Sequence, residues 1–115
     1  MRYMFLIYND ENLDPTPGSA QAAKRMDAYR AFSEDVAADK SLLAGDRLQP
    51  IAAATTVRIR DGRTQVTDGP FAETKEQLGG YYILECANLD QALARAAQIP
   101  SALTGSIEVR PIVDM

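Results

Sequence analysis

The chain has 115 residues, enough for one domain with a good core but not for two, so we expect a single domain over residues 1–115. Its 46% hydrophobic and 24% charged residues are typical of globular proteins, and no apolar run approaches the ~20 residues of a membrane span. A net charge of −4 argues against general binding of nucleic acid, because phosphates require a basic face. The first residues lack the pattern of a signal peptide, so we expect a cytoplasmic protein.

The absence of histidine restricts the chemistry more than any other feature of the composition. His-based triads, His–metal sites and imidazole proton shuttles are excluded, so an acid–base group must be a carboxylate, a lysine, a tyrosine or the single cysteine. One cysteine allows neither an intrachain disulfide nor a cysteine-rich zinc site. Cys86 ends an apolar segment, and we expect it to be a small core residue rather than a reactive thiol.

The first third of the chain predicts a strand followed by a long helix. Residues 2–8 carry apolar side chains at both alternating sets of positions, which is typical of a strand covered on both faces. A helix is expected from about Ala20 to Lys40, capped by Thr16 or by Ser19. Its apolar stripe consists of Met26, Tyr29, Phe32 (or Ser33) and Val36.

The middle of the chain predicts a strand and a β-hairpin. Residues 42–48 form a strand pattern that Gly45 interrupts. Asp61-Gly62 separates two alternating segments, 55–60 and 63–67, and this dipeptide is a strong signal for a two-residue hairpin turn. The cross-strand pairs that such a turn sets are Arg60 with Arg63, Ile59 with Thr64 and Val57 with Val66.

The last third predicts a strand, a short helix and a final strand. Thr74 and Gln77 match a capping box, which predicts one helical turn before the strand at residues 81–86. Asn88 and Gln91 form a second capping box and open a helix that Pro100 ends. The expected apolar side of that helix consists of Leu89, Leu93, Ala96 and Ala97. Residues 106–110 form the final strand.

This order contains two strand–helix–strand units in tandem, the plan of a ferredoxin-like α+β fold with an extra β-hairpin. In that plan both helices pack on one face of an antiparallel sheet and the other face stays open. The apolar residues expected on that open face need a cover, and a second copy of the chain is the simplest one. We therefore expect a homodimer that pairs sheet to sheet.

Charged residues concentrate between Asp68 and Gly80, around an apolar phenylalanine. A carboxylate beside an apolar wall can act as a general acid or base, and a lysine can hold an anion. The alternative is a polar connection without chemistry, in which the side chain of Asp68 caps the turn ahead of Pro70. The candidate catalytic residues are Asp68, Glu73 and Lys75, and the candidate ligand-binding residues are Tyr8, Phe71 and Glu76.

The spacing of the carboxylates matches no known metal-binding loop, and glycine-rich nucleotide fingerprints are absent, so we expect no metal and no cofactor.

The sequence leaves three classes of function open. The first class is a small-molecule binder that moves a proton in a lyase or isomerase reaction. The second is a partner of a transcription regulator, and the third is a dimer in which the charged segment is structural.

Four segments of the chain resemble DGPF-domain proteins, a branch of the YCII-related family. They are residues 2–8, 54–58, 67–81 and 107–112, and the third of them is highly specific. The resemblance implies a ferredoxin-like fold that pairs as a dimeric α/β barrel. It also implies a His–Asp catalytic pair, which this histidine-free chain cannot carry, and a relative that is a dehydrochlorinase of a chlorinated aromatic. For the DGPF branch it implies an accessory role beside extracytoplasmic-function sigma factors.

Overall fold

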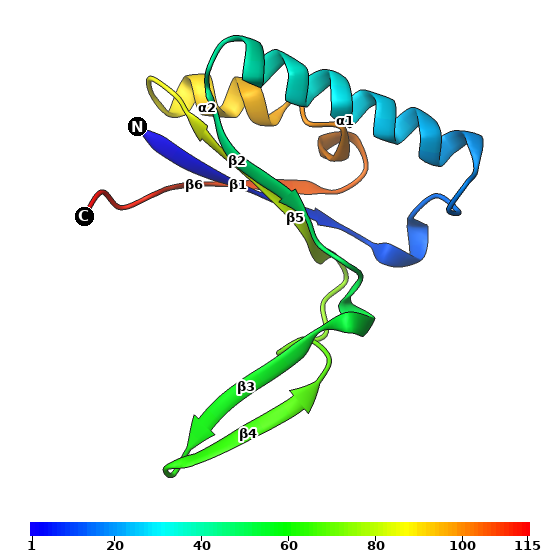
Figure 1. The fold of residues 1–115 in the computed structure, drawn as a ribbon, viewed down its shortest axis with the longest axis vertical. Helices are drawn as coiled ribbons and strands as arrows, with labels where there is room; N and C mark the ends of the chain where they lie inside the picture. The colour runs from blue at the N-terminus through cyan, green and yellow to red at the C-terminus, as the bar shows by residue number, and fades with distance from the viewer.

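A computed structural model describes residues 1–115 as a four-stranded antiparallel sheet with two helices on one face and a separate hairpin (Figure 1). The sheet has the order β2–β5–β1–β6, which confirms the ferredoxin-like α+β prediction. Its strands are β1 (Arg2–Asn9), β2 (Leu42–Arg47), β5 (Gln77–Glu85) and β6 (Ser106–Pro111). The helices are α1 (Ala20–Ala38) and α2 (Leu89–Ala96), and the hairpin consists of β3 (Thr55–Arg60) and β4 (Arg63–Asp68). Neither helix has the length and apolar character required to span a membrane.

The core lies between the sheet and the helices. Every second residue of β1, namely Tyr3, Phe5 and Ile7, is buried against the helices. The inward residues of β5 pair with them across the sheet, so Tyr82 lies opposite Phe5 and Leu84 opposite Tyr3. The remaining core residues are Phe32, Val36, Cys86, Ala92, Ala96 and Ile99. This alternation confirms β1 as a central strand with two apolar faces.

The helices agree with their predicted positions but differ in the faces they bury. Ser19, rather than Thr16, caps α1 by accepting a hydrogen bond from the backbone amide of Ala22. The predicted stripe of α1 is correct at Phe32 and Val36, whereas Met26 is half exposed. For α2 the predicted side is partly wrong, because the helix buries Ala92 and Ala96 and leaves its two leucines half exposed. Small alanine side chains let this short helix lie close to the sheet.

Two local predictions are wrong because pairing between distant strands overrides them. β2 continues through Gly45, and its irregularity lies between Leu42 and Ala44. No helical turn forms at Thr74–Gln77; the Gln77 side chain instead donates to the carbonyl oxygen of Thr74 over 2.6 Å. Gln77 already pairs with Asn9 as the first residue of β5. The hydrogen bonds gained with the end of β1 replace those of the local cap.

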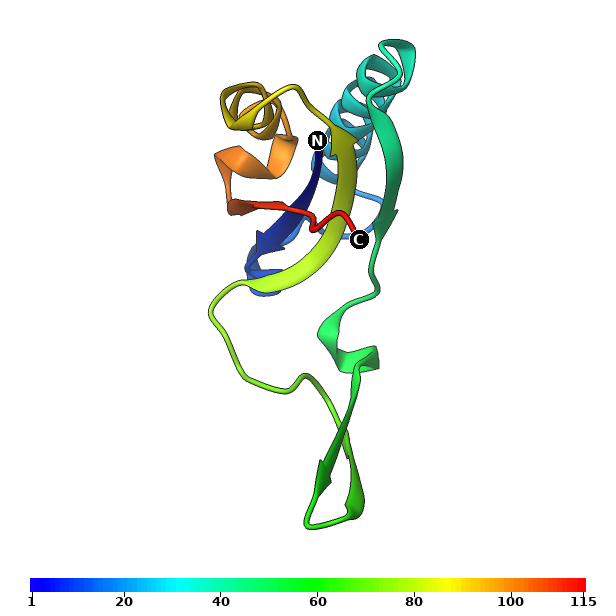
Figure 2. The same cartoon turned by 90° about the vertical axis from the view of Figure 1, so that its left-hand side faces the viewer.

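The β3–β4 hairpin, called the arm below, projects away from the sheet and the helices (Figures 1 and 2). Its register is the predicted one, with Arg60 opposite Arg63 and Val57 opposite Val66. The turn residues Asp61 and Gly62 have φ values of +53° and +74°, as a two-residue turn with the twist of the flanking strands requires. The predicted turn is therefore confirmed.

The sheet face opposite the helices is open and has an apolar centre. Met4, Leu6 and Tyr8 of β1 lie on it beside Tyr81 and Ile83 of β5, and none of these side chains is fully buried. Polar groups border this centre on both sides. The Tyr81 hydroxyl donates to the Asp46 carboxylate over 2.7 Å, and Arg110 pairs with Glu108 on β6. An apolar centre with a polar rim is the usual anatomy of a protein–protein interface.

The dimensions of the chain are larger than those of a compact domain of its length. Its accessible surface is 8213 Å², against about 6,200 Å² for a folded monomer of 12.6 kDa. Its radius of gyration is 16.1 Å, against about 13 Å for a compact domain of this length. The excess surface is roughly 2,000 Å², which is more than the ~800 Å² that each partner of a standard interface buries.

Candidate functional site

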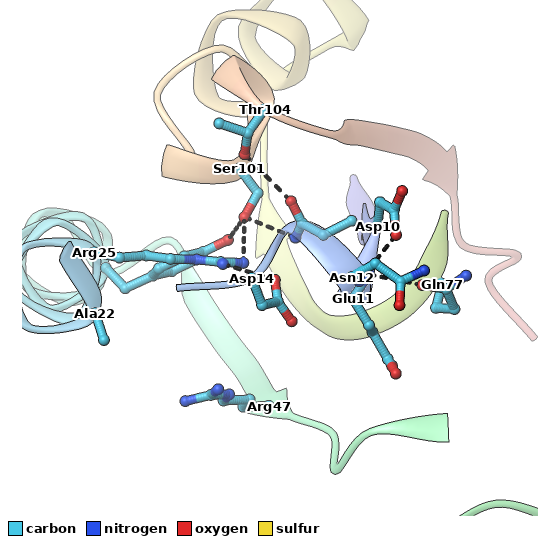
Figure 3. Close-up of polar contacts among 12 residues, drawn as sticks. Asp10, Glu11, Asn12, Asp14, Ala22, Arg25, Arg47, Gln77, Ser101 and Thr104 are labelled. Carbon is cyan, nitrogen blue, oxygen red and sulfur yellow. Dashed lines mark hydrogen bonds and ion pairs between the residues drawn. The ribbon is translucent and has the colours of Figure 1, made fainter. Parts of the chain in front are cut away.

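The sheet end at which β1 finishes brings together polar side chains from three distant parts of the chain. Ser101, in the short 3-10 turn η3 (Pro100–Leu103), is 1% exposed and lies at their centre. Its hydroxyl oxygen accepts hydrogen bonds from the side-chain amide of Asn9 over 3.0 Å and from the Arg25 guanidinium over 3.4 Å. It also makes a short hydrogen bond with the Tyr29 hydroxyl. Figure 3 shows Arg25 and Ser101 side by side in this cluster.

A groove of about 580 Å³ runs beside this cluster, between α1, η3 and the loop after β1. Carbon atoms of residues such as Leu13, Pro15 and Leu103 form much of its wall. Its polar lining includes Asn9 and Thr104, whose side chains hydrogen-bond to one another over 3.4 Å. An apolar groove with a few convergent polar groups is the common form of a small-molecule site.

Three of the four charged residues of the groove have a hydrogen-bond or ion-pair partner, and one does not. Asp10 accepts a hydrogen bond from the backbone amide of Asn12, and Asp14 pairs with Arg25 over 3.0 Å. Arg25 is therefore held from two sides, by Asp14 and by Ser101. Lys24 has no such partner. The two acidic and two basic side chains of the groove balance in charge, and Lys24 is the one of them that can pair with a negatively charged oxygen of a ligand.

Gly105 allows the turn between η3 and β6 to lie close to the end of β1. A Cβ atom at this position would collide with the carbonyl oxygen of Tyr8 and would lie 2.7 Å from the side-chain oxygen of Asn9. The turn between η3 and β6 can approach β1 this closely only because residue 105 has no side chain. The close approach lets Asn9 reach both Ser101 and Thr104.

Two of the residues predicted from the sequence lie at the same end of the sheet. Tyr8 pairs with Ser106 of β6, and the Ser106 hydroxyl donates to the Glu76 carboxylate over 2.8 Å. Gln77, the next residue, accepts a hydrogen bond from the backbone amide of Glu11 over 2.9 Å. The end of the Asp68–Glu76 segment therefore reaches the end of β1.

None of the residues predicted from the sequence lines the groove in the single chain. Asp68, Glu73 and Lys75 are exposed, and Phe71, expected to be an apolar wall, is itself 75% exposed. The start of the segment is attached to the arm, because the Arg58 guanidinium donates to the Phe71 carbonyl oxygen over 3.1 Å. The amide of Gly69 donates to the carbonyl oxygen of Ala54. This turn is thus held by β3, and its hydrogen bonds do not require the side chain of Asp68.

Three side chains with shifted pKa values lie outside the groove. Burial raises the pKa of the Cys86 thiol, which is 2% exposed, so the thiol stays neutral and Cys86 is the core residue predicted from the sequence. The hydrogen bond to Asp46 raises the pKa of Tyr81, and burial raises that of Tyr82. Both tyrosines therefore remain protonated at neutral pH. No three cysteine, aspartate or glutamate side chains converge as ligands of a metal ion.

Comparisons with known proteins agree with this fold. The sequence profile of the YCII-related domain matches residues 1–115. An uncharacterised protein of Rhizobium meliloti (strain 1021) is 42% identical over 114 residues, which cover 97% of this chain and 92% of that protein. A solved structure is similar with a TM-score of 0.53 and 17% identity over 98% of this chain and 94% of that chain. It is 5-chloro-2-hydroxyhydroquinone dehydrochlorinase from Burkholderia phenoliruptrix AC1100, in complex with 2,5-dihydroxybenzoquinone.

The fold and the groove define a small ferredoxin-like α+β protein with a polar cluster at one end of its sheet. The chain belongs to the YCII-related family, because the family profile covers its whole length and a relative is 42% identical. This confirms the family that the four sequence segments indicated.

Proposed function

We propose that this protein is a homodimer that binds a small organic molecule in the groove beside Ser101 and transfers a proton to or from it, as in a lyase or isomerase reaction. The observation that carries the proposal is that Asn9 and Arg25, two donors that line the groove, are both fixed by hydrogen bonds to Ser101. Asn9 and Arg25 are held by their hydrogen bonds before a ligand arrives, so little side-chain entropy is lost on binding.

The class of ligand follows from the charges of the groove. Lys24 favours an oxyanion such as a carboxylate, an enolate or an ionised ring hydroxyl. The carbon-rich wall favours a flat or compact apolar body. A hydroxylated quinone, like the molecule bound in the similar dehydrochlorinase structure, combines both properties. We therefore take 2,5-dihydroxybenzoquinone as the first probe.

The acid–base groups follow from the absence of histidine. Asp68 and Glu73 are our candidate proton acceptors, with Lys75 beside them to hold the developing negative charge. Tyr8, Phe71 and Glu76 would contact the ligand. In a single chain these groups lie outside the groove. The proposal therefore requires that they come into contact with the ligand in the homodimer.

Arg25→Ala is expected to weaken binding of 2,5-dihydroxybenzoquinone at least about 10-fold, because it removes a charge-assisted hydrogen bond and leaves Asp14 unpaired. Titration calorimetry measures the dissociation constant. Arg30→Ala is the matched control, since Arg30 is on the same helix in an exposed ion pair with Asp27 and should change binding by less than about twofold. Equal affinity of wild type and Arg25→Ala would remove the groove as the site.

A thermal-shift screen tests the ligand class more widely. A ligand at 100 times its dissociation constant adds ~2.7 kcal/mol to the free energy of unfolding. For a domain of this size, this raises the midpoint temperature of thermal unfolding by several degrees. Hydroxylated quinones, phenols and small carboxylates should raise it. A screen in which none of these compounds changes the midpoint would contradict the proposal.

Asp68→Asn, Glu73→Gln and Lys75→Met test the acid–base groups separately from binding. Each change removes a charge and nearly keeps the shape, so turnover should fall at least about 100-fold in one or more of them while the fold is retained. Turnover is followed as proton exchange between the bound compound and deuterated water, by NMR. Unchanged exchange in all three variants would exclude the Asp68–Glu76 segment from the chemistry.

A further inference from the structure

The arm has one apolar and one polar face. Its register places Val57 opposite Val66 and Ile59 next along the same face. These three side chains are 60%, 65% and 65% exposed, so nothing in the protomer covers them. The opposite face carries Arg58, Gln65 and the Arg60–Arg63 pair. An isolated two-stranded hairpin is marginally stable in water, and one with a bare apolar face needs a surface to pack on.

The base of the arm is held in place, so the arm points in a defined direction. The amide of Leu48 donates to the carbonyl oxygen of Gly79 over 2.8 Å, and the amide of Ile51 donates to the Glu11 carboxylate over 3.1 Å. The Thr56 hydroxyl donates to the carbonyl oxygen of Gly69 over 2.8 Å, which joins the two ends of the arm to each other. The connection that leads into β3 is therefore anchored on the body of the chain, and the end of β4 is tied to β3.

Surface area and charge indicate that the missing surface is a second copy of this chain. The excess accessible surface of roughly 2,000 Å² per protomer is large enough for a stable dimer. Residues 55–68 contain three arginines and two aspartates, whereas the whole chain has a net charge of −4. The arm is thus positive and the remainder of the chain carries a net charge of −5. The three arginines lie on the polar face of the arm, so this opposite charge attracts a second copy at long range and is not a contact within the apolar face.

We infer that the arm packs its face of Val57, Ile59 and Val66 on a second copy of this chain, and that the second copy does the same in return. This inference rests on the dimer of the proposed function and adds a second contact to it. Because the Asp68–Glu76 segment continues directly from β4, arm exchange places Asp68, Glu73 and Lys75 at the boundary between the two copies. One copy alone therefore does not complete the proposed acid–base site.

Val66→Glu and Gln65→Glu form a matched pair that tests this contact. The two residues are neighbours on β4, the changes add the same charge, and only the first lies on the apolar face. We expect Val66→Glu to raise the dimer dissociation constant at least about 100-fold and Gln65→Glu to change it by less than about threefold. Sedimentation equilibrium measures both. Equal dissociation constants for the two variants would overturn the inference.

The same measurements separate this inference from the proposed dimer. If Leu6→Glu on the open sheet face dissociates the protein while Val66→Glu does not, the sheet dimer holds and the arm contact is wrong. If the wild type is a folded monomer, both the dimer and the arm contact are wrong. If both variants dissociate the protein while Gln65→Glu does not, the arm contact is supported.

If Val66→Glu unfolds the arm, its effect on the dissociation constant does not test the contact. Tryptophan fluorescence provides a second measurement for this reason. The chain has no tryptophan, so Val57→Trp provides a single tryptophan on the apolar face. Its emission should be blue-shifted at high protein concentration and move to the red on dilution through the dissociation constant. Gln65→Trp, on the polar face, should emit in the red at every concentration. Red emission from Val57→Trp at concentrations where sedimentation shows a dimer would overturn the inference.

Discussion

Replacing Leu6 with glutamate is expected to convert a dimer into monomers or unfold the chain. Leu6 lies at the centre of the open sheet face, with Tyr81 beside it on β5 and Glu108 on β6. In a sheet-to-sheet dimer the new carboxylate would be buried without a partner and close to another carboxylate. An uncompensated buried charge costs about 3–5 kcal/mol, which raises the dissociation constant at least about 100-fold.

Leu89→Glu is the control for this change. Leu89 is the first residue of α2, it is half exposed, and it lies away from the open sheet face. A glutamate in the first turn of a helix is favourable, so this variant should retain the wild-type mass and stability. Sedimentation equilibrium of both variants gives the masses, and urea denaturation shows whether Leu6→Glu stays folded. A folded Leu6→Glu dimer with wild-type affinity would show that this face is not the interface.

Gly105→Ala is expected to lower the free energy of unfolding by about 3 kcal/mol and to abolish binding in the groove. The added Cβ would collide with the carbonyl oxygen of Tyr8, a backbone atom that cannot rotate away as a side chain can. Overpacking of this kind costs about 1–3 kcal/mol. We expect a cost of about 3 kcal/mol, because both the turn that carries Gly105 and the end of β1 are backbone segments that move little. The strand end must move, which separates Asn9 from Ser101.

Gly79→Ala is the matched control, because no atom lies within 4 Å of the added Cβ and the residue does not have a positive φ. Its free energy of unfolding should change by less than about 1 kcal/mol. Urea denaturation and calorimetry with 2,5-dihydroxybenzoquinone measure stability and binding for both variants. If Gly105→Ala matches Gly79→Ala in both measurements, the close approach of the η3–β6 turn to β1 is not what builds the site.

Much of the fold follows from local patterns in the sequence. The alternation of β1 indicated a strand with two apolar faces, and the structure buries Phe5 while leaving Leu6 on the open face. Asp61-Gly62 fixed both the turn and the register of the arm, because few dipeptides adopt two consecutive positive φ values easily. The capping box at Asn88 was also correct, with its side chain accepting from the amide of Gln91.

The wrong predictions have one physical cause. Thr74 and Gln77 contain the chemistry of a helix cap, but Gln77 gains more by pairing with Asn9 as part of β5. In the same way, the periodicity of α2 predicted Ala96 on the buried side, but it did not show that Ala92 would face the sheet in place of the two leucines. In both places contacts with distant residues outweigh a local preference, and a single sequence does not contain those contacts.

The polar cluster could not be found from the sequence because its members are far apart in it. Asn9 and Ser101 are separated by 92 positions, and Tyr29 and Ser101 by 72. The sequence pattern places Tyr29 in the apolar stripe of the long helix. That position accounts for the contacts of its ring but not for those of its hydroxyl. The one available signal was Ser101 itself, a polar residue between apolar neighbours after Pro100, where a buried hydroxyl must find partners.

The mass of the wild-type protein in solution tests the proposed dimer most directly, because the proposed acid–base site, the proposed cover of the open face and the arm contact all require a second copy. Sedimentation equilibrium at micromolar concentration should give twice the chain mass of 12.6 kDa, in a single folded species. A stable folded species of 12.6 kDa at that concentration would contradict the dimer, the covered sheet face and the exchanged arm together.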